Sequence, residues 1–382
     1  MRSGQALGPG ELRVAIVGAG SGGHVYPAVA IAEAMKALDD RIEVHFVGTR
    51  RRYRWPESPV APPPGYPFHT LLVGRLNRHA PVRERMETLL KLPLAFTKSL
   101  WILARVRPKL VLGVGGAESG PLVLLAAVIG IPTAIWEPNA WPGFTNRRLS
   151  RFVDLVFLVH DEAAGRLRAR SVAKAGVPLR SVFRSAPSSV ERESLHLLVL
   201  GGSQGAPGLN KVVREACGRD TDWLHGVRVV HQTGRLEYEV VRDCYDALPP
   251  TVRDRIEVRD YLMDVHRRLE WADLVVCRGG ASTLAELAAC GRAAIVVPLG
   301  DAADNHQHWN ADAFRRAGAV SVIAEDTLTP ESFVAAVREF QHDRELLRAL
   351  ERNVRRLHRS HAAQGIAERL LTMLPPSRDA GS

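Results

Sequence analysis

The stretch of residues 271–286, WADLVVCRGGASTLAE, carries the strongest fold signal in this sequence. The apolar run 274–277 predicts a buried strand, the two glycines predict a tight turn, and the following ASTLAE predicts a helix from about Ala281. A strand that passes through glycines directly into a helix is one half of a βαβ unit. The N–H groups of the first helical turn, including those of Ser282 and Thr283, would then face a ligand beyond the strand, and a phosphate suits them.

Polar side chains that suit a nucleoside and a sugar follow this turn. Glu286 lies about one helical turn further on, on the same side as Ser282, and a carboxylate can accept hydrogen bonds from both hydroxyls of a ribose. The alternative is a Glu that is only stabilised by the helix N-terminus, which is worth about 0.3–1 kcal/mol. The segment NHQHWN, residues 305–310, offers amide and imidazole groups at another helix start, either for sugar hydroxyls or as a solvated surface.

Three other segments repeat the order of strand, glycine turn and helix. They are VAIVGAGSGGH at 14–24, VLGVGGAESGP at 111–121 and LLVLGGSQG at 197–205, where Ser203 could donate to a phosphate. Two such turns in the first half predict a crevice at the carboxyl ends of the strands, for a diphosphate-bearing ligand; two ordinary tight turns are the alternative. The first turn also fits the dinucleotide pattern GxGxxG, but the residue at the ribose-acid position, Glu43, comes at the start of its strand.

The same alternation of strands and helices runs through the whole chain of 382 residues. We expect strands at 14–17, 44–47, 110–112 and 133–136, and, after a polar pause at 181–192, at 195–200, 227–231, 255–258, 274–277 and 294–297. This pattern predicts an α/β protein with two doubly wound, Rossmann-like domains and an interdomain cleft. A helix is expected from about 27 to 38, an irregular loop with six prolines at 56–67, and one long polar helix at about 344–371.

The composition limits the possible binding partners of the chain but does not identify one. The net charge of +10 favours a nucleic acid, an anionic membrane surface or a phosphorylated substrate, but the basic residues are spread widely and no nucleic-acid-binding module is present. The four cysteines form no CxxC pair, so neither a zinc site nor a disulfide framework is indicated, and a reducing cytoplasm is expected. The longest apolar stretch, 121–136, is interrupted and shorter than the ~20 residues that a membrane-spanning helix needs.

His24 is the candidate general base. It stands at the start of a helix, directly after two glycines, where the positive end of the helix favours a neutral imidazole that can accept a proton. A helix-capping histidine is the alternative. Glu118 and Glu137 are the next candidates for the base. No metal is expected, since the only DxD sequence, at 220–222, fits a surface turn better than a metal site.

Seven segments, in order and at consistent spacing between about 13 and 325, resemble one family. They are GAGSGGHVYPAVAIAE, GVGGAESGP, EPNAWPGFTNR, LLVLGGSQGAPGLN, HQTG, WADLVVCRGGASTLAELAACGRAAIVVPL and NHQHWNA, and they resemble the lipid I N-acetylglucosaminyltransferases of the MurG type in glycosyltransferase family 28. The resemblance implies the GT-B fold without a cofactor. It implies inverting transfer of N-acetylglucosamine from UDP-N-acetylglucosamine to lipid I, the undecaprenyl pyrophosphate-linked muramyl peptide. The product, lipid II, serves peptidoglycan biosynthesis, cell shape and cell division.

The resemblance also implies roles for individual residues. His24 would be the catalytic residue or an acceptor contact, and Tyr261 with Leu262 would frame the uracil. Contacts to UDP-N-acetylglucosamine would come from Ser21, Gly22, Gly23, Asn139, Arg180, Ser203, Leu262, Ser282, Thr283, Glu286, His306 and Gln307. Asn139 would also lie near the acceptor, and the acceptor side would include Gly115, Gly116, Glu118 and Asn146.

The chain departs from the family pattern in its first half. The family usually has Tyr where this chain has Ala117, Gln where it has Pro138, and Asn where it has Val177. A related GT-B glycosyltransferase with a different lipid or natural-product acceptor is therefore the second hypothesis. A non-catalytic protein that binds a nucleotide sugar or nucleic acid is the third.

These expectations divide the chain into functional parts. We expect a disordered N-terminus at 1–11, an acceptor and membrane-facing domain at 12–180, a linker at 181–193, a UDP-N-acetylglucosamine domain at 194–345, and a C-terminal helix and tail at 346–382. The apolar stretch 89–102 has basic flanks, which suits peripheral docking on the cytoplasmic face of the cell membrane. Because a helix of this fold buries an apolar stripe anyway, only a minority of these residues would touch lipid.

Overall fold

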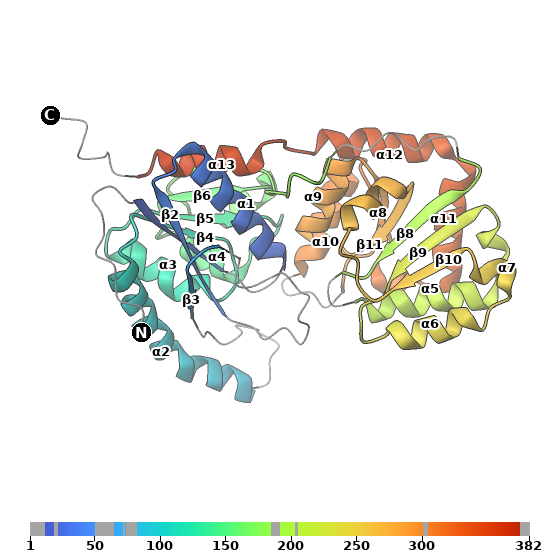
Figure 1. Cartoon of the computed structure of the whole chain (residues 1–382), viewed down its shortest axis with the longest axis horizontal. Helices are drawn as coiled ribbons and strands as arrows, with labels where there is room; N and C mark the ends of the chain where they lie inside the picture. Colours follow the sequence, from blue (N-terminus) through green and yellow to red (C-terminus); the bar gives the residue numbers. More distant parts are fainter. Residues whose placement is uncertain are drawn as a thin grey trace. The chain divides into compact units, whose positions relative to one another are not determined.

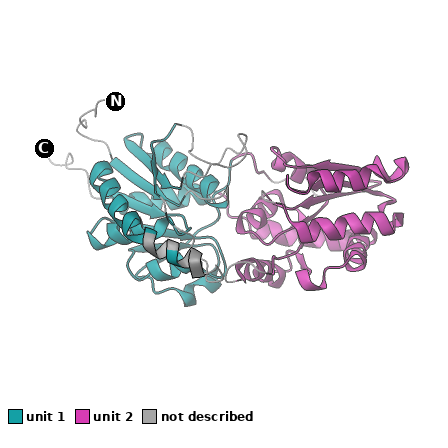
Figure 2. Ribbon diagram, turned by 90° about the horizontal axis from the view of Figure 1, so that it is seen from below, with its two compact units in different colours: residues 1–180, 361–382 teal, residues 181–360 magenta. Residues whose placement is uncertain are grey.

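The computed structural model describes residues 12–18, 22–49, 65–71, 73, 82–184, 192–202, 205–300 and 305–374, without the side chains of 82–85 and 87–90. The chain divides into two compact units, residues 1–180 with 361–382 and residues 181–360 (Figure 2). The segment 1–11 that we expected to be disordered, most of the proline-rich loop 56–67 and the middle of the linker lie outside the described residues.

The first unit contains a parallel sheet of seven strands in the order β3-β2-β1-β4-β5-β6-β7 (Figure 1). Its strands are β1 Leu12–Val17, β2 Ile42–Gly48, β3 Phe68–Thr70, β4 Leu110–Gly113, β5 Thr133–Glu137, β6 Leu155–Leu158 and β7 Val172–Lys174. The chain starts in the middle of the sheet and adds strands outward in both directions, which is the doubly wound topology. All the neighbouring carboxyl ends therefore lie at one edge, where the glycine turns follow β1 and β4.

Helices cover this sheet because each buries an apolar stripe. They are α1 Gly22–Leu38, α2 Val82–Val106, α3 Ser119–Val128, α4 Phe144–Leu149, the short 3₁₀ helix η1 Asp161–Arg166 and α13 Ala362–Leu371. Ile102 of α2 and Leu122 of α3 belong to one buried cluster with Val17 of β1. The C-terminal helix α13 packs against α1, and Ile366 and Leu370 are fully buried (Figure 1).

The second unit repeats the topology with six parallel strands in the order β10-β9-β8-β11-β12-β13. The strands are β8 Leu195–Leu200, β9 Val227–Gln232, β10 Ile256–Arg259, β11 Leu274–Cys277, β12 Ala293–Val296 and β13 Ser321–Val322. The helices are α5 Pro207–Arg219, η2 Asp222–Leu224, α6 Tyr238–Asp246, α7 Pro250–Arg253, α8 Val265–Trp271, α9 Ala281–Cys290, α10 His306–Arg316, η4 Glu325–Thr327, α11 Pro330–His342 and α12 Arg344–Arg356. The structure therefore confirms the predicted GT-B architecture of two doubly wound α/β units.

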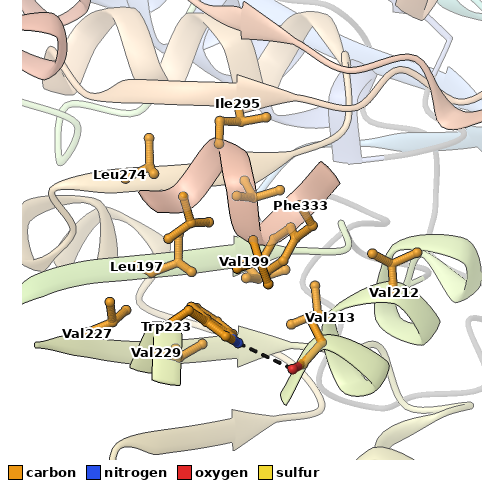
Figure 3. Close-up of a cluster of buried hydrophobic side chains, with 14 of the residues drawn as sticks. Leu197, Val199, Val212, Val213, Trp223, Val227, Val229, Leu274, Ile295 and Phe333 are labelled. Atoms are coloured by element: carbon orange, nitrogen blue, oxygen red, sulfur yellow. Dashed lines mark hydrogen bonds between the residues drawn. The ribbon is translucent and has the colours of Figure 1, made fainter. Parts of the chain in front are cut away.

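A large apolar cluster lies between this sheet and the helices α5 and α11 (Figure 3). Trp223 is buried at its centre, with its ring edge-on to Phe333 at a centroid distance of 5.6 Å. Its indole N–H donates to the carbonyl of Ala216 at 3.3 Å, so the one polar atom of this large side chain is satisfied (Figure 3).

The structure corrects the predicted elements at several places. The expected long helix at 344–371 is wrong: α12 ends at Arg356, His361 adopts a left-handed conformation with φ of 61°, and α13 starts a new helix in the other unit. Helix α1 begins at Gly22, five residues before the expected start. Four of the described strands were not predicted. Strands β3, β7 and β13 have only two or three residues, none of them buried, and so carry no apolar run. Strand β6 was missed although its four residues, LVFL, are apolar and buried.

Candidate active site

The N-terminus of α9 is open in the second unit. Gly280 occupies the N-cap position with extended backbone angles, φ −71° and ψ 136°, and no side chain caps the helix. The first helical hydrogen bond runs from the Leu284 N–H to the Gly280 carbonyl at 3.0 Å. Since a helix leaves its first N–H groups without partners inside the helix, those of Ser282 and Thr283 remain available to an anion.

Glu286 follows one turn along the same helix, as the sequence predicted. The side chains of Ser282, Thr283 and Glu286 are all partly exposed, and spacings of three and four residues place them on one helix face. A carboxylate and two hydroxyls thus line up beside the open N–H groups. This arrangement can bind a ligand that carries both a phosphate and a vicinal diol.

The start of α10 lies directly against the glycine turn that precedes α9. A Cβ atom on Gly279 would stand 2.5 Å from the carbonyl oxygen of Gln307, so only glycine allows this approach. The fully buried Asn310 donates through Nδ2 to the Gly279 carbonyl at 3.2 Å. His306 and Gln307 are therefore held next to the turn, and the side-chain oxygen of Gln307 accepts the Leu299 N–H at 3.1 Å. Their expected contact with the sugar hydroxyls stays a prediction.

Arg278 lies in the same turn, but its charged group pairs with a carboxylate of this chain rather than facing the ligand site. Its guanidinium pairs with Glu325 at 2.5 Å and donates to the Val297 carbonyl at 3.2 Å. The other oxygen of Glu325 accepts the Gly300 N–H at 2.8 Å. Arg278 thus joins the ends of β11 and β12, and the helix N–H groups supply the local positive potential for an anion.

In the first unit, the two glycine turns that were expected to meet are in direct contact. Gly18 has φ of +124°, and a Cβ atom on it would lie 2.2 Å from the carbonyl oxygen of Gly115. Gly115 has φ of +107°, and a Cβ atom there would lie 2.9 Å from Cε1 of His24. The imidazole of His24 therefore rests on the backbone of the second turn, at the edge where β1 and β4 end.

Glu118 lies close to the next glycine of the same turn, Gly116. It is 7% exposed, and a Cβ atom on Gly116, whose φ is +83°, would lie 2.6 Å from its Oε2. The hydroxyl of Ser119 donates to the Gly116 carbonyl at 2.8 Å. Each of the two consecutive glycines thus accepts the close approach of an ionisable side chain, His24 on Gly115 and Glu118 on Gly116.

Glu137 organises the loop that follows β5. Its Oε1 accepts both the backbone N–H and the side-chain Nδ2 of Asn139, at 3.0 and 2.9 Å, and its Oε2 accepts the Gly143 N–H and Nδ2 of Asn146, both at 2.9 Å. Burial raises the pKa of this carboxyl, and the hydrogen bonds from Asn139, Asn146 and Gly143 oppose the shift. Because these donors occupy both oxygens, the geometry favours a positioning role for Glu137 over the role of base.

The two asparagines expected near the acceptor take part in this arrangement. Asn146 is 3% exposed and donates to the Trp136 carbonyl at 3.1 Å as well as to Glu137. Asn139 is partly exposed. The sequence held a signal for these hydrogen bonds to Glu137, since this Glu ends a strand and is followed within nine residues by two Asn and a Gly.

The remaining predicted residues lie as follows. The Arg180 guanidinium lies over the Tyr26 ring at 4.9 Å, in the first unit, and the contact that was expected between Arg180 and the nucleotide stays a prediction. Leu262 is buried and Tyr261 is partly exposed after β10, while Gly22 and Gly23 form the first turn of α1. Ser21 and Ser203 lie outside the described residues.

Two alternative sites can be compared with the structure. Glu43, the residue that a dinucleotide site would need at the ribose, lies at the amino end of β2 and pairs with Arg13 at 2.9 Å. Asp220 accepts the Asp222 N–H at 2.8 Å and pairs with Arg338 at 3.3 Å, as in a surface turn. Over the described ranges, no three His, Cys, Asp or Glu side chains come together in a way that could hold a metal ion.

Comparison with known proteins gives matches over both units. Residues 14–158 match the family model "Glycosyltransferase family 28 N-terminal domain", and residues 196–370 match "Glycosyltransferase family 28 C-terminal domain". A protein of Bdellovibrio bacteriovorus named UDP-N-acetylglucosamine–N-acetylmuramyl-(pentapeptide) pyrophosphoryl-undecaprenol N-acetylglucosamine transferase is 41% identical over 359 residues, which cover 94% of this chain and 98% of that protein.

Solved structures agree with these matches. The crystal structure of Acinetobacter baumannii MurG is similar with a TM-score of 0.74 and 27% identity, over 94% of this chain and 99% of that one. The glycosyltransferase of kitacinnamycin is similar in fold, with a TM-score of 0.67 but only 18% identity, over 96% of this chain and all of that one.

Proposed function

This chain belongs to glycosyltransferase family 28, and from that premise we propose that it transfers N-acetylglucosamine from UDP-N-acetylglucosamine to lipid I, which yields lipid II for peptidoglycan. The observation that carries the proposal is the 41% identity, over nearly the full length of both chains, to a protein named for this reaction. The hypothesis of a natural-product acceptor is less favoured, because the enzyme of that kind shares only the fold, at 18% identity.

On the donor side, the open N-terminus of α9 supports binding of the UDP diphosphate. The N–H groups and hydroxyls of Ser282 and Thr283 would hold its oxygens, and Glu286 would accept both ribose hydroxyls. When the bond between the anomeric carbon and the diphosphate breaks, its electron pair stays on UDP. Donors that are already oriented stabilise this developing charge, so no metal is required in this mechanism.

On the acceptor side, His24 would take the proton of the muramic acid C4 hydroxyl. The hydroxyl oxygen attacks the anomeric carbon from the face opposite to UDP, so the configuration at that carbon is inverted. The support is the contact of the imidazole with Gly115, since a glycine without a side chain lets the ring sit at the carboxyl edge of the sheet. Glu118, beside the same turn, is the second candidate for the base.

The experiment is a transfer assay with labelled UDP-N-acetylglucosamine and purified lipid I. The expected product is a lipid-linked disaccharide with inverted configuration at the transferred sugar. A matched reaction with UDP-glucose tests the donor, and a second with undecaprenyl phosphate, which lacks the muramyl group, tests the acceptor. If the enzyme binds UDP but transfers sugar to neither lipid I nor a short-chain analogue of lipid I, then lipid I is rejected as the acceptor and a different acceptor is favoured.

We further propose that the enzyme docks peripherally on the cytoplasmic face of the membrane through α2. Leu94, Leu100 and Trp101 are exposed by 69%, 53% and 53%, and the ammonium group of Lys98 lies 4.5 Å from the Trp101 ring centroid. Ile102, in the same apolar stretch, is instead buried against the sheet. Exposed apolar side chains with a neighbouring lysine suit an anionic lipid surface.

Among the helices that the structure describes, none has the length and apolar character needed to span a bilayer. Sedimentation with vesicles that contain anionic lipid would test the docking surface. Trp101→Glu should reduce binding strongly, whereas Leu236→Glu, which changes an 81% exposed apolar residue of the other unit, should not. Equal losses in both variants would contradict a role for α2.

A further inference from the structure

The segment HQTG, His231–Gly234, belongs to the family pattern but has no role in the mechanism above. It contains the last two residues of β9 and the first two residues of the turn that follows. Strand β9 lies between β8 and β10 in the sheet. The turn after β8 contains Ser203, expected at the nucleotide, and the turn after β10 contains Tyr261 and Leu262, expected at the uracil. We propose that Gln232 is a positioning residue of the nucleotide site, which ties the turn after β8 to the turn after β10. This inference rests on the proposed function.

One amide group makes both connections. Nε2 of Gln232 donates to the Gly202 carbonyl at 2.9 Å and to the Asp260 carbonyl at 3.2 Å. Both partners are carbonyl oxygens, which can only accept, so the side-chain orientation is unambiguous. Gln232 is 4% exposed, and each of its two N–H groups has a partner on a different turn.

The turn after β8 contacts the backbone of the segment 231–234. The Gly201 N–H donates to the Gln232 carbonyl at 3.1 Å. Gly205 has φ of +80°, and a Cβ atom on it would lie 2.5 Å from the Thr233 carbonyl oxygen. Any side chain at Gly205 would be forced against the Thr233 carbonyl, so Gly201 and Gly205, which are described at the two ends of this turn, take their positions from Gln232 and Thr233.

The turn after β10 is held on the opposite side of the segment. The Thr233 N–H donates to the Arg259 carbonyl at 2.9 Å, and Gln232 binds the next residue, Asp260. The Asp260 carboxylate in turn accepts the N–H of Tyr261 at 2.7 Å. A substitution at Gln232 would therefore remove a hydrogen bond to the backbone of Asp260, the residue before Tyr261 of the expected uracil site.

Buried side chains fix the segment from the core side. Nδ2 of Asn210 donates to the Thr233 carbonyl at 2.7 Å, so its Oδ1 is the acceptor for Nε2 of His231 at 3.1 Å. His231 then carries its proton on Nε2, and Tyr245 donates to Nδ1 at 2.8 Å. Burial lowers the pKa of His231 to about 3, which keeps the ring neutral in this chain of hydrogen bonds. Gln232 thus extends from a rigid base.

The test compares nucleotide binding by Gln232→Glu and Gln232→Met with the wild type. Glu keeps the size but places a carboxylate oxygen against two carbonyl oxygens, and Met keeps the length without donors. Calorimetry should show UDP affinity lowered by about tenfold or more, since two buried acceptors lose their partner. Uridine has no diphosphate and so does not need the turn after β8, where Ser203 could donate to a phosphate. It should therefore lose less affinity than UDP. The KM for UDP-N-acetylglucosamine should rise while the KM for lipid I stays unchanged.

Gln341→Glu is the matched control. Gln341 also donates its side-chain amide to a backbone carbonyl, that of His225 at 2.7 Å, two residues before the opposite end of β9. It should leave UDP affinity unchanged. If both Gln232 variants fold and bind UDP as the wild type does, or lose UDP and uridine affinity equally, the inference is overturned. If the Glu variant does not fold, the Met variant decides. A wild-type enzyme that does not bind UDP would overturn the proposed function itself, and the inference with it.

Discussion

At the scale of single residues, the absence of side chains at three glycines decides where the reactive groups lie. Gly18 allows the Gly115 carbonyl to approach, and Gly115 allows the His24 ring to rest on the backbone. Gly279 similarly brings the Gln307 backbone to the start of α9. Each of these contacts would fail with any other residue, so the glycines act on the site through the geometry of their neighbours.

His24→Ala should lower turnover by roughly 10²–10⁴-fold, the usual contribution of a general base. UDP affinity should barely change, because the residues proposed for the diphosphate and the ribose, Ser282, Thr283 and Glu286, belong to the other unit. Steady-state kinetics with both substrates varied is the measurement. If the KM for lipid I rises while kcat stays nearly normal, His24 is a binding residue and Glu118 becomes the candidate base.

Glu286→Ala should weaken UDP binding by about 1.5–3 kcal/mol, the value of a hydrogen bond to a charged group. The carboxylate lies one turn beyond the open N-terminus of α9, where it would accept the ribose hydroxyls. Calorimetry with UDP and with 2′-deoxy-UDP separates the contact from a general effect. The deoxy ligand should show a smaller difference between wild type and variant, and an unchanged UDP affinity would reject the ribose role.

At the scale of elements, the loop between β5 and α4 owes its shape to one carboxylate. Glu137 binds the backbone at Asn139 and Gly143, and it binds a side chain of α4 through Asn146. A buried acceptor with several donors is costly to remove, since each N–H group that bound it loses its partner. The loop therefore depends on a residue that need not touch substrate.

Glu137→Gln should lower the free energy of unfolding by about 1–3 kcal/mol and raise the KM for lipid I. One end of the new side chain is an NH₂ group, which would face two N–H donors. Denaturant unfolding measures the first effect, and Glu162→Gln, at an exposed site of η1, is the control. If the two variants are equally stable, the loop is held by other contacts.

The end of β9 should make the second unit sensitive to acid. The pKa of His231 is about 3 in the folded protein, below the ordinary value of 6.5, because of burial. The unfolded chain therefore binds a proton that the folded chain does not, so stability falls as pH drops from about 6.5 towards 3, by about 1.4 kcal/mol per pH unit.

Comparison of the wild type with His231→Gln isolates this contribution, because other histidines titrate in both proteins. The stability difference between them should shrink as pH falls from 7 to 5, in unfolding experiments at fixed ionic strength. A difference that stays constant over this range would show that His231 is not the acid-sensitive group.

At the scale of the whole molecule, the last helix joins the first unit. The chain leaves that unit at residue 180 and returns at residue 361, so α13 completes the unit that begins with β1 (Figure 2). Ile366, Ala367 and Leu370 are buried where α13 packs on α1. The first unit is therefore made of two segments that are far apart in the sequence.

Leu370→Ala should destabilise the first unit by about 2–5 kcal/mol, the usual cost of emptying a fully buried leucine site. Leu371→Ala, at the partly exposed next position, should cost clearly less. UDP affinity should stay unchanged in both, because the residues proposed to bind the diphosphate and the ribose belong to the second unit. Urea unfolding followed in parallel with UDP calorimetry checks this, and a loss of UDP affinity in Leu370→Ala would show that α13 also supports the donor site.

Local signals in the sequence were enough to predict the two doubly wound units, the helix start after β11 and a common crevice for the glycine turns after β1 and β4. Apolar runs, glycines and helix starts are local signals, and the right-handed winding of parallel strands then brings the carboxyl ends of neighbouring strands together. The sequence placed His24 at the start of the helix after β1, but its contact with Gly115 of the second turn was not predicted.

The partners of the polar residues in these motifs could not be read from the sequence. Asn146, Gln232 and Asn310 are amides in family segments, and any of them could have faced a substrate. The structure places all three in buried sites, with Nδ2 or Nε2 donating to backbone carbonyls. The return of α13 to α1 was equally unpredictable. The physical reason is that both depend on contacts between residues far apart in the sequence, and no spacing within a motif encodes them.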